Sequence, residues 1–376
     1  MSTSNRLAEI LSVMLLLVLF GCGKTTDKTN KFALVLKPDL REKEISYKKL
    51  FSGCEIIEIE TNVECLLSNI DKMICKGDSI YIFDMHLSNL YLFSSDGKFL
   101  NKIGERGQGP EEYIQCYDFS LYPNSDIVSM LSPYGEIINY HNNGKYSDRK
   151  KLPDKPNYFA CSWINSKEIA LWSAMDMSEP GLTVYDVDAE KIVCEDWYND
   201  RMLDMTRLNP FFQNDQNLFF AAPMSFSVYE FKDKSFEKVY EWDLNNRFIS
   251  EGYIQMINRI NNQSEKNDRL ISDMETGELI CPFFNGENER YYYISLLRGI
   301  GEKASAINIL YEKSSGKSLT FQKLSEGISI YPLFMNEDYL LCLIPYNEVN
   351  TYNKLFNKNL VKSEDENPLV ARFYFK

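Results

Sequence analysis

The sequence has few of the residues from which hydrolytic, metal-dependent and redox sites are usually built. Its 376 residues include two histidines, His86 and His141, and neither belongs to a zinc-type cluster. It contains no Gly-x-Ser-x-Gly nucleophile elbow, and none of its nine cysteines forms a Cys-x-x-Cys pair. These absences argue against a histidine-dependent hydrolase, a zinc centre and a thiol–disulfide centre.

Basic residues are also fewer than acidic ones. The chain has 41 Lys and Arg against 54 Asp and Glu, which gives a net charge of −13. Nucleic acid is therefore an unfavourable partner, because its phosphates require clustered Lys and Arg. No segment after residue 20 is apolar for long enough to cross a bilayer, which takes about 20 residues.

The first residues predict export. Arg6 precedes the apolar run Ile10–Phe20, which is short for a transmembrane helix but typical of a signal peptide. The run ends in Leu-Phe-Gly-Cys-Gly at 19–23, which resembles the lipobox of bacterial lipoproteins, in which the cysteine carries the lipid. We therefore expect a signal peptide at 1–21, lipidation of Cys22 and a polar tether over 22–44. Few acidic residues follow Cys22, so we expect anchoring on the periplasmic side of the outer membrane.

The other eight cysteines are scattered, mostly inside apolar runs. A chain of this length does not need disulfides to fold, and free cysteine behaves as a small core residue. We expect buried thiols at positions 54, 65, 75, 116, 161, 194, 281 and 342.

A short turn recurs along the chain at nearly constant spacing. Four or five residues before each turn there is an aromatic residue, and the turns are 47, 45, 45 and 82 residues apart when counted between Gly97, Gly144, Ala189, Lys234 and Gly316. Repeats of this length are typical of solenoids and propellers. Around each turn the sequence alternates short β-branched and aromatic runs with Asn, Asp and Gly, which indicates four antiparallel strands per repeat.

Six such units predict an all-β, six-bladed propeller over residues 45–376. The last unit lacks one strand, and Glu55–Glu60 is left over at the start. We expect Glu55–Glu60 to pair with Leu369–Phe375, because closing the ring through both chain ends removes exposed sheet edges.

The 82-residue step predicts an insertion near 245–276. Ile249, Tyr253, Ile257 and Ile260 follow helical spacing with Ser250 as a possible cap, and the polar stretch 261–268 reads as a mobile loop. A second extension, at 346–367, is rich in Asn and charged residues. Both are expected on a face of the ring.

One loop resembles a known family. Residues 104–113, Gly-Glu-Arg-Gly-Gln-Gly-Pro-Glu-Glu-Tyr, indicate a crossing between two blades, where glycines permit positive φ and Pro110 fixes the approach. The stretch is similar to the Gly-x-Gly-Pro-Gly-Glu-Tyr crossing of six-bladed β-propeller lipoproteins of Bacteroidetes-type bacteria, which are related in pattern to NHL-repeat propellers. The matching residues are Gly107, Gly109, Pro110, Glu112 and Tyr113, whereas Glu111 stands where glycine is usual; Gly104 begins the motif. The resemblance implies the fold and carries no established reaction.

Candidate ligand-binding residues are sparse, and each has a structural alternative. Asp84 and Asp118 are candidates for the channel, as in related calcium-dependent lactonases, or they cap turns. Trp163 and Trp172 either stack on a sugar ring or fill the core. Arg106 in the crossing loop is a further candidate.

These observations favour a binding module without catalytic activity, cofactor or metal. We expect a monomer that is attached to the membrane only through its lipid and that binds a protein, peptide or glycan of the cell envelope. The alternative is a lyase or lactonase with a calcium ion held by Asp and Asn oxygens at the central channel.

Overall fold

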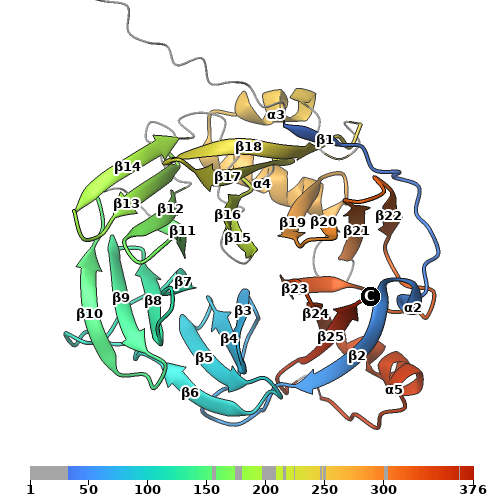
Figure 1. Cartoon of the computed structure of the whole chain (residues 1–376), viewed down its shortest axis with the longest axis horizontal. Helices are drawn as coiled ribbons and strands as arrows, with labels where there is room; N and C mark the ends of the chain where they lie inside the picture. The colour runs from blue at the N-terminus through green and yellow to red at the C-terminus, as the bar shows by residue number, and fades with distance from the viewer. Residues whose placement is uncertain are drawn as a thin grey trace, which may run out of the picture. The chain divides into compact units, whose positions relative to one another are not determined.

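This computed structural model describes residues 33–154, 158–173, 180–196, 209–214, 217–223, 225–245, 248, 251–299, 304–363 and 365–376. The compact unit is Leu34–Lys376, and within it the chain forms the predicted six-bladed β-propeller. The first strand of each blade lies nearest the central axis (Figure 1). The signal peptide, Cys22, Ile249 and Ser250 lie outside the described residues.

Each blade is an antiparallel four-stranded sheet whose strands succeed one another from the axis outwards. Blade 1 contains β3 (Lys72–Lys76), β4 (Ser79–Asp84), β5 (Asn89–Ser94) and β6 (Phe99–Ile103); blade 2 contains β7 (Asp118–Leu121), β8 (Ile127–Ser132), β9 (Glu136–His141) and β10 (Tyr146–Lys151). Blade 3 contains β11 (Tyr158–Trp163), β12 (Glu168–Ser173), β13 (Leu182–Asp186) and β14 (Lys191–Asp196); blade 4 contains β15 (Phe211–Asn214), β16 (Asn217–Phe220), β17 (Ser227–Lys232) and β18 (Ser235–Trp242). Blade 5 contains β19 (Ile280–Glu287), β20 (Tyr291–Arg298), β21 (Ser305–Glu312) and β22 (Ser318–Phe321); blade 6 contains β23 (Tyr331–Met335), β24 (Tyr339–Ile344), β25 (Leu369–Phe375) and β2 (Phe51–Glu58).

The core lies between the blades. Successive residues of a strand point to opposite faces, so a strand buried on both faces is apolar at nearly every position. In β4, Tyr81 and Phe83 pack against blade 2, whereas Ile80 and Ile82 pack against blade 6. Each of the six gaps between neighbouring blades is filled by its own apolar cluster.

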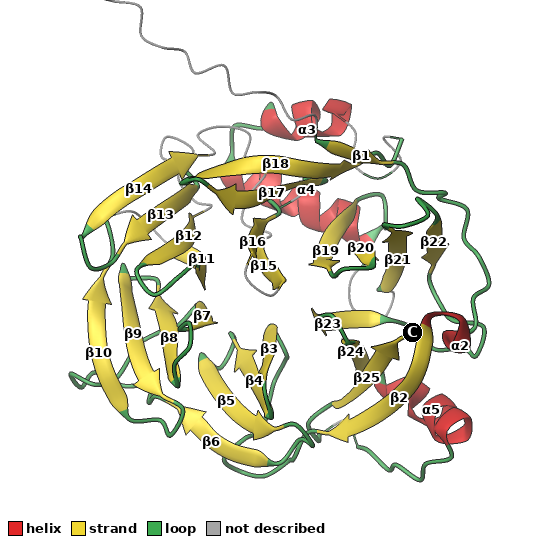
Figure 2. Ribbon diagram, viewed as in Figure 1, coloured by secondary structure: helices red, strands yellow, loops and turns green. Residues whose placement is uncertain are grey.

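The two ends of the propeller share blade 6, as predicted. β2 pairs antiparallel with β25 in a register that sets Glu55 opposite Arg372 and Glu58 opposite Leu369. Figure 2 shows β2 as the outermost strand of this blade. Closure therefore depends on one sheet made from the first and last strands of the ring.

The segment Leu34–Ser46, which we call the rim segment, corrects the predicted tether. β1 (Leu34–Leu36) adds a parallel fifth strand to β18 of blade 4, and the chain then follows the outer strand of blade 5, where the amide of Lys43 donates to Thr320 O at 2.8 Å. Leu36 is fully buried. The compact unit thus includes residues 34–44, which the sequence assigned to the tether, and these residues lie along sheet edges that would otherwise be exposed.

Helices occupy the insertion and the extension. The insertion holds α3 (Glu251–Asn258) and α4 (Gln263–Glu275), which pack through Ile257 and Leu270. The prediction of a loop over 261–268 is wrong. Asn262 Oδ1 accepts from the amides of Ser264 and Glu265, and this N-cap begins α4 within that stretch. The other helices within the described residues are α2 (Tyr47–Leu50), the 3₁₀ turn η2 (Tyr346–Glu348) and α5 (Val349–Phe356). No helix in the described ranges is long and apolar enough to cross a membrane.

Candidate functional site

The crossing loop of residues 104–113 is held together by its own groups. One carboxylate oxygen of Glu112 accepts from the amide of Gly109 at 2.8 Å, and the amide of Gly107 donates to Tyr113 O at 2.9 Å. The Tyr113 hydroxyl is buried and donates to Ser88 O of blade 1 at 2.8 Å. These bonds fix the chain as it passes from blade 1 to blade 2.

Two different structural constraints require glycine in this loop. Gly104 has φ of +70°, and a Cβ there would lie 2.8 Å from the Tyr140 ring. Gly107 does not have positive φ, contrary to the expectation from the sequence; a Cβ there would overlap the carboxylate of Glu112. Gly107 therefore makes room for the glutamate that closes the loop.

Asp84 and Asp118 are both buried and both bonded within the protein. Asp84 accepts from the backbone amides of Ser68 at 2.6 Å and Leu87 at 2.9 Å. Asp118 accepts from Lys72 Nζ at 2.8 Å and from the amide of Cys161 at 2.8 Å. Burial raises the pKa of Asp118, and the Lys72 ammonium opposes that rise.

Side chains join the innermost strands of blades 1 to 4. Lys72 of β3 reaches Asp118 of β7; Ser120 Oγ of β7 accepts from the amide of Trp163 in β11 at 3.1 Å; and Gln213 Nε2 of β15 donates to Trp163 O at 2.8 Å. These polar groups on the innermost strands of blades 1 to 4 therefore hold neighbouring blades together. Among the described residues, no group of three His, Cys, Asp or Glu side chains is placed to hold a metal ion.

The two candidate tryptophans are buried. Trp163 is 3% exposed and its Nε1 donates to Ser129 Oγ at 2.9 Å. Trp172 is 2% exposed and packs against Phe220 with ring centroids 5.2 Å apart. Neither ring offers a face to a sugar.

Arg106 is exposed, and its Nε donates to Ile114 O at 3.2 Å. The five candidates lie on separate elements and form no common site.

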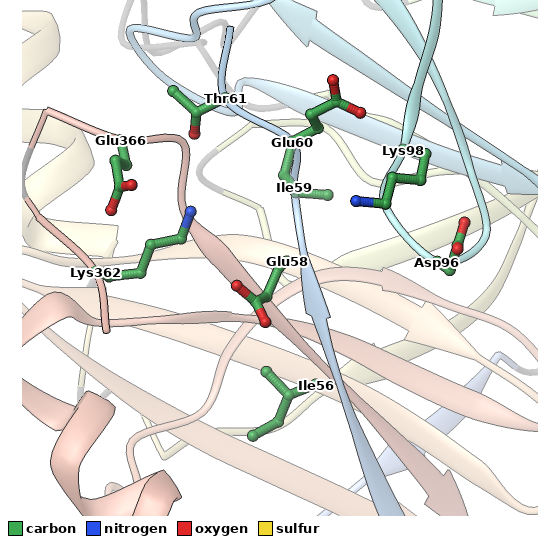
Figure 3. Close-up of a pocket in the computed structure, with 9 residues that line it drawn as sticks. All are labelled: Ile56, Glu58, Ile59, Glu60, Thr61, Asp96, Lys98, Lys362 and Glu366. Atoms are coloured by element: carbon green, nitrogen blue, oxygen red, sulfur yellow. The ribbon is translucent and has the colours of Figure 1, made fainter. Parts of the chain in front are cut away.

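A polar groove lies instead where blade 6 meets blade 1. This seam groove has a volume of about 410 Å³ and is lined by Ile56, Glu58, Ile59, Glu60, Thr61, Asp96, Lys98, Lys362 and Glu366 (Figure 3). Three segments contribute to it: the end of β2 with the residues that follow, the turn between β5 and β6, and the segment before β25.

Asn367 ties two of these segments together. It is fully buried; its Nδ2 donates to Glu60 O at 2.6 Å and to Cys65 O at 2.7 Å, and its Oδ1 accepts from the amide of Leu67 at 2.8 Å. The amide of Glu60 donates to Gly97 O at 2.9 Å. The walls of the groove are thus hydrogen-bonded to one another.

Some charged groups of the groove accept hydrogen bonds from the protein itself, and others do not. Glu60 accepts from the amide of Phe99 at 3.0 Å, which lowers the pKa of its carboxyl, and Glu366 accepts from the amide of Ser363 at 2.8 Å. Asp96 accepts from the Ser94 hydroxyl. In the part of the chain that the structure describes, no hydrogen-bond or ion-pair partner contacts the side-chain charges of Glu58, Lys98 or Lys362.

Sequence reasoning missed this groove. Its members are separated by up to about 300 positions in the sequence, and none belongs to a chemical motif. The pairing predicted between the terminal strands was the available signal, because it brings residues near 58 to the segment before residue 369.

Comparisons with known proteins identify the family of the chain and structures of similar fold. A family model described as a domain of unknown function, DUF4934, matches residues 36–374. No curated protein matches the sequence. One similar solved structure, described as an exported protein of Bacteroides fragilis, has a TM-score of 0.72 at 15% identity and covers 91% of this chain and 99% of that one. A member of the DUF4221 family from Bacteroides vulgatus has a TM-score of 0.53 at 10% identity, covering 86% and 97%. At these identities the likeness shows the fold alone.

Proposed function

The chain belongs to the DUF4934 family, and on that premise we propose that it is an exported binding module of the cell envelope. It is anchored through a lipid on Cys22 at the periplasmic side of the outer membrane, and it binds a protein, peptide or glycan without transforming it. The apolar run Ile10–Phe20 and the cysteine that follows it support export and anchoring. The similar fold of an exported Bacteroides protein is consistent with export.

The observation that carries the binding role is the contrast between the channel and the seam groove. Asp84, Asp118 and Trp163 are bonded and buried within the ring. Among the described residues, the charges of Glu58, Lys98 and Lys362 have no hydrogen-bond or close ion-pair partner, and they line an open groove (Figure 3). Unengaged charges in a groove with braced walls are suited to recognition of another molecule.

A pulldown from envelope extracts tests this function. The full-length protein should retain a specific partner, and Glu58→Lys should lose most of it, because the substitution reverses a charge in the groove. Glu237→Lys is the matched control: Glu237 is exposed on β18 of blade 4, away from the groove. Equal recovery by all three proteins, or no partner for the full-length protein, would contradict the proposal.

A further inference from the structure

We propose that the seam groove binds an extended, basic segment of a polypeptide. This inference rests on the proposed binding function and names the ligand chemistry of the same site.

Charge gives the first argument. The groove is lined by four carboxylates, Glu58, Glu60, Asp96 and Glu366, and by two ammonium groups, Lys98 and Lys362. It therefore carries two net negative charges, on a chain whose net charge is −13. Hydrogen bonds from amides and hydroxyls do not neutralise these carboxylates. A cationic ligand is attracted both at long range and in the groove, whereas an anionic ligand is repelled.

The unengaged groups give the second argument. Glu58 needs a hydrogen-bond donor, and Lys98 and Lys362 need acceptors. In Figure 3 both lysines extend towards β2, with the Glu58 carboxylate between them. A basic polypeptide supplies both kinds of group, since its Lys or Arg side chain donates to Glu58 and its backbone carbonyls accept from the lysines. A metal ion or a simple polyamine has no acceptors to offer.

Exposed apolar residues that are close in sequence to the lining residues give the third argument. Val63 is 100% exposed, Leu66 is 48% exposed and Val361 is 89% exposed. Val63 and Leu66 lie on the loop that Asn367 fixes through Cys65 and Leu67. Exposed apolar residues within a few positions of a charged groove's lining suit the mixed side chains of a polypeptide. The nine lining residues include no aromatic ring on which a sugar could stack, which disfavours a glycan.

Fluorescence anisotropy with defined peptides tests the proposal on the purified full chain. The probes are a labelled nonapeptide of three Lys-Val-Gly repeats and its Glu-for-Lys counterpart. We expect the lysine peptide to bind and the glutamate peptide not to bind. Glu58→Gln should raise the Kd about fivefold, as expected of a partly exposed ion pair. Glu237→Gln removes the same charge from blade 4 and should leave the Kd unchanged.

Several results would overturn the assignment. These are tighter binding of the glutamate peptide, equal weakening by Glu58→Gln and Glu237→Gln, and displacement of the lysine peptide by a neutral oligosaccharide. Self-association that disappears in Glu58→Gln would make a second copy of the chain the occupant and would also overturn it. An envelope partner that is lost in Glu58→Lys, together with no lysine-peptide binding, would refute the basic ligand and leave the binding function standing. Absence of any envelope partner would refute the binding function itself.

Discussion

Gly97→Ala is expected to lower the free energy of unfolding by about 4 kcal/mol, combining the cost of a left-handed alanine with that of a backbone overlap. Gly97 has φ of +89°, and a Cβ there would overlap the carbonyl oxygen of Glu58 and lie 2.9 Å from its carbonyl carbon. Both obstacles are backbone atoms of the closing strand β2, so the seam must open for the side chain to fit. Urea unfolding followed by tryptophan fluorescence measures the loss.

Gly135→Ala provides the control. Gly135 has φ of +79°, and a Cβ there would meet no atom within 4 Å. This variant should lose about 1 kcal/mol from backbone strain alone. Equal losses in the two variants would show that the overlap with β2 adds no cost beyond that of the positive φ.

The same geometry accounts for the glycine in one further turn. Gly144 occupies the corresponding turn of blade 2, and a Cβ there would lie 2.8 Å from Lys102 O in the outer strand of blade 1. In both blades the turn between the third and fourth strands packs against the outer strand of the preceding blade. At these two turns the glycine therefore marks a contact between blades.

Lys72→Met is expected to lower the free energy of unfolding by about 4 kcal/mol near pH 8, because it leaves a buried charge without its partner. The Lys72 ammonium lies 2.8 Å from Asp118 Oδ1 and donates to Phe119 O at 2.6 Å, and the two charged side chains are 12% and 6% exposed. Urea unfolding at pH 8 and pH 5 measures the loss.

The loss in Lys72→Met should shrink as the pH falls. Burial raises the pKa of Asp118 in the folded protein, and removing Lys72 raises it further. A carboxyl whose pKa is higher in the folded state is penalised above that pKa, and the penalty disappears as the pH falls towards its unfolded value. The loss at pH 5 should therefore be smaller than at pH 8.

Lys98→Met is the control for Lys72→Met. Lys98 is exposed and has no ion-pair partner among the described residues, so the change should stay within about 0.5 kcal/mol. A pH-independent loss in Lys72→Met, or one matching the control, would contradict the assigned role of the pair.

Local sequence patterns were sufficient to predict the blades. Phe93, Tyr140 and Tyr185 lie at or near the ends of third strands and are buried, and the short apolar runs between turn residues coincide with strands. The start of the domain was harder to predict, because the rim segment is ordered by edges that only the folded ring provides. The start of α4 depended on the Asn262 cap within a stretch that is polar throughout.

The candidate site could not be predicted in the same way. Asp84, Asp118 and Trp163 are residue types that serve in binding sites, but whether such a group is free depends on partners that are distant in sequence, such as Lys72 and Ser129. The seam groove requires three remote segments to meet, and its residues are ordinary surface charges until closure brings them together.

Photo-crosslinking in cells that make the protein tests most directly whether recognition occurs at the seam and not at the channel. A photoreactive residue is placed at position 98 in the seam groove, or at position 213, an exposed position on the innermost strand β15. The account predicts a discrete adduct with an envelope polypeptide from position 98 and none from position 213. An adduct from position 213 with none from position 98 would contradict it.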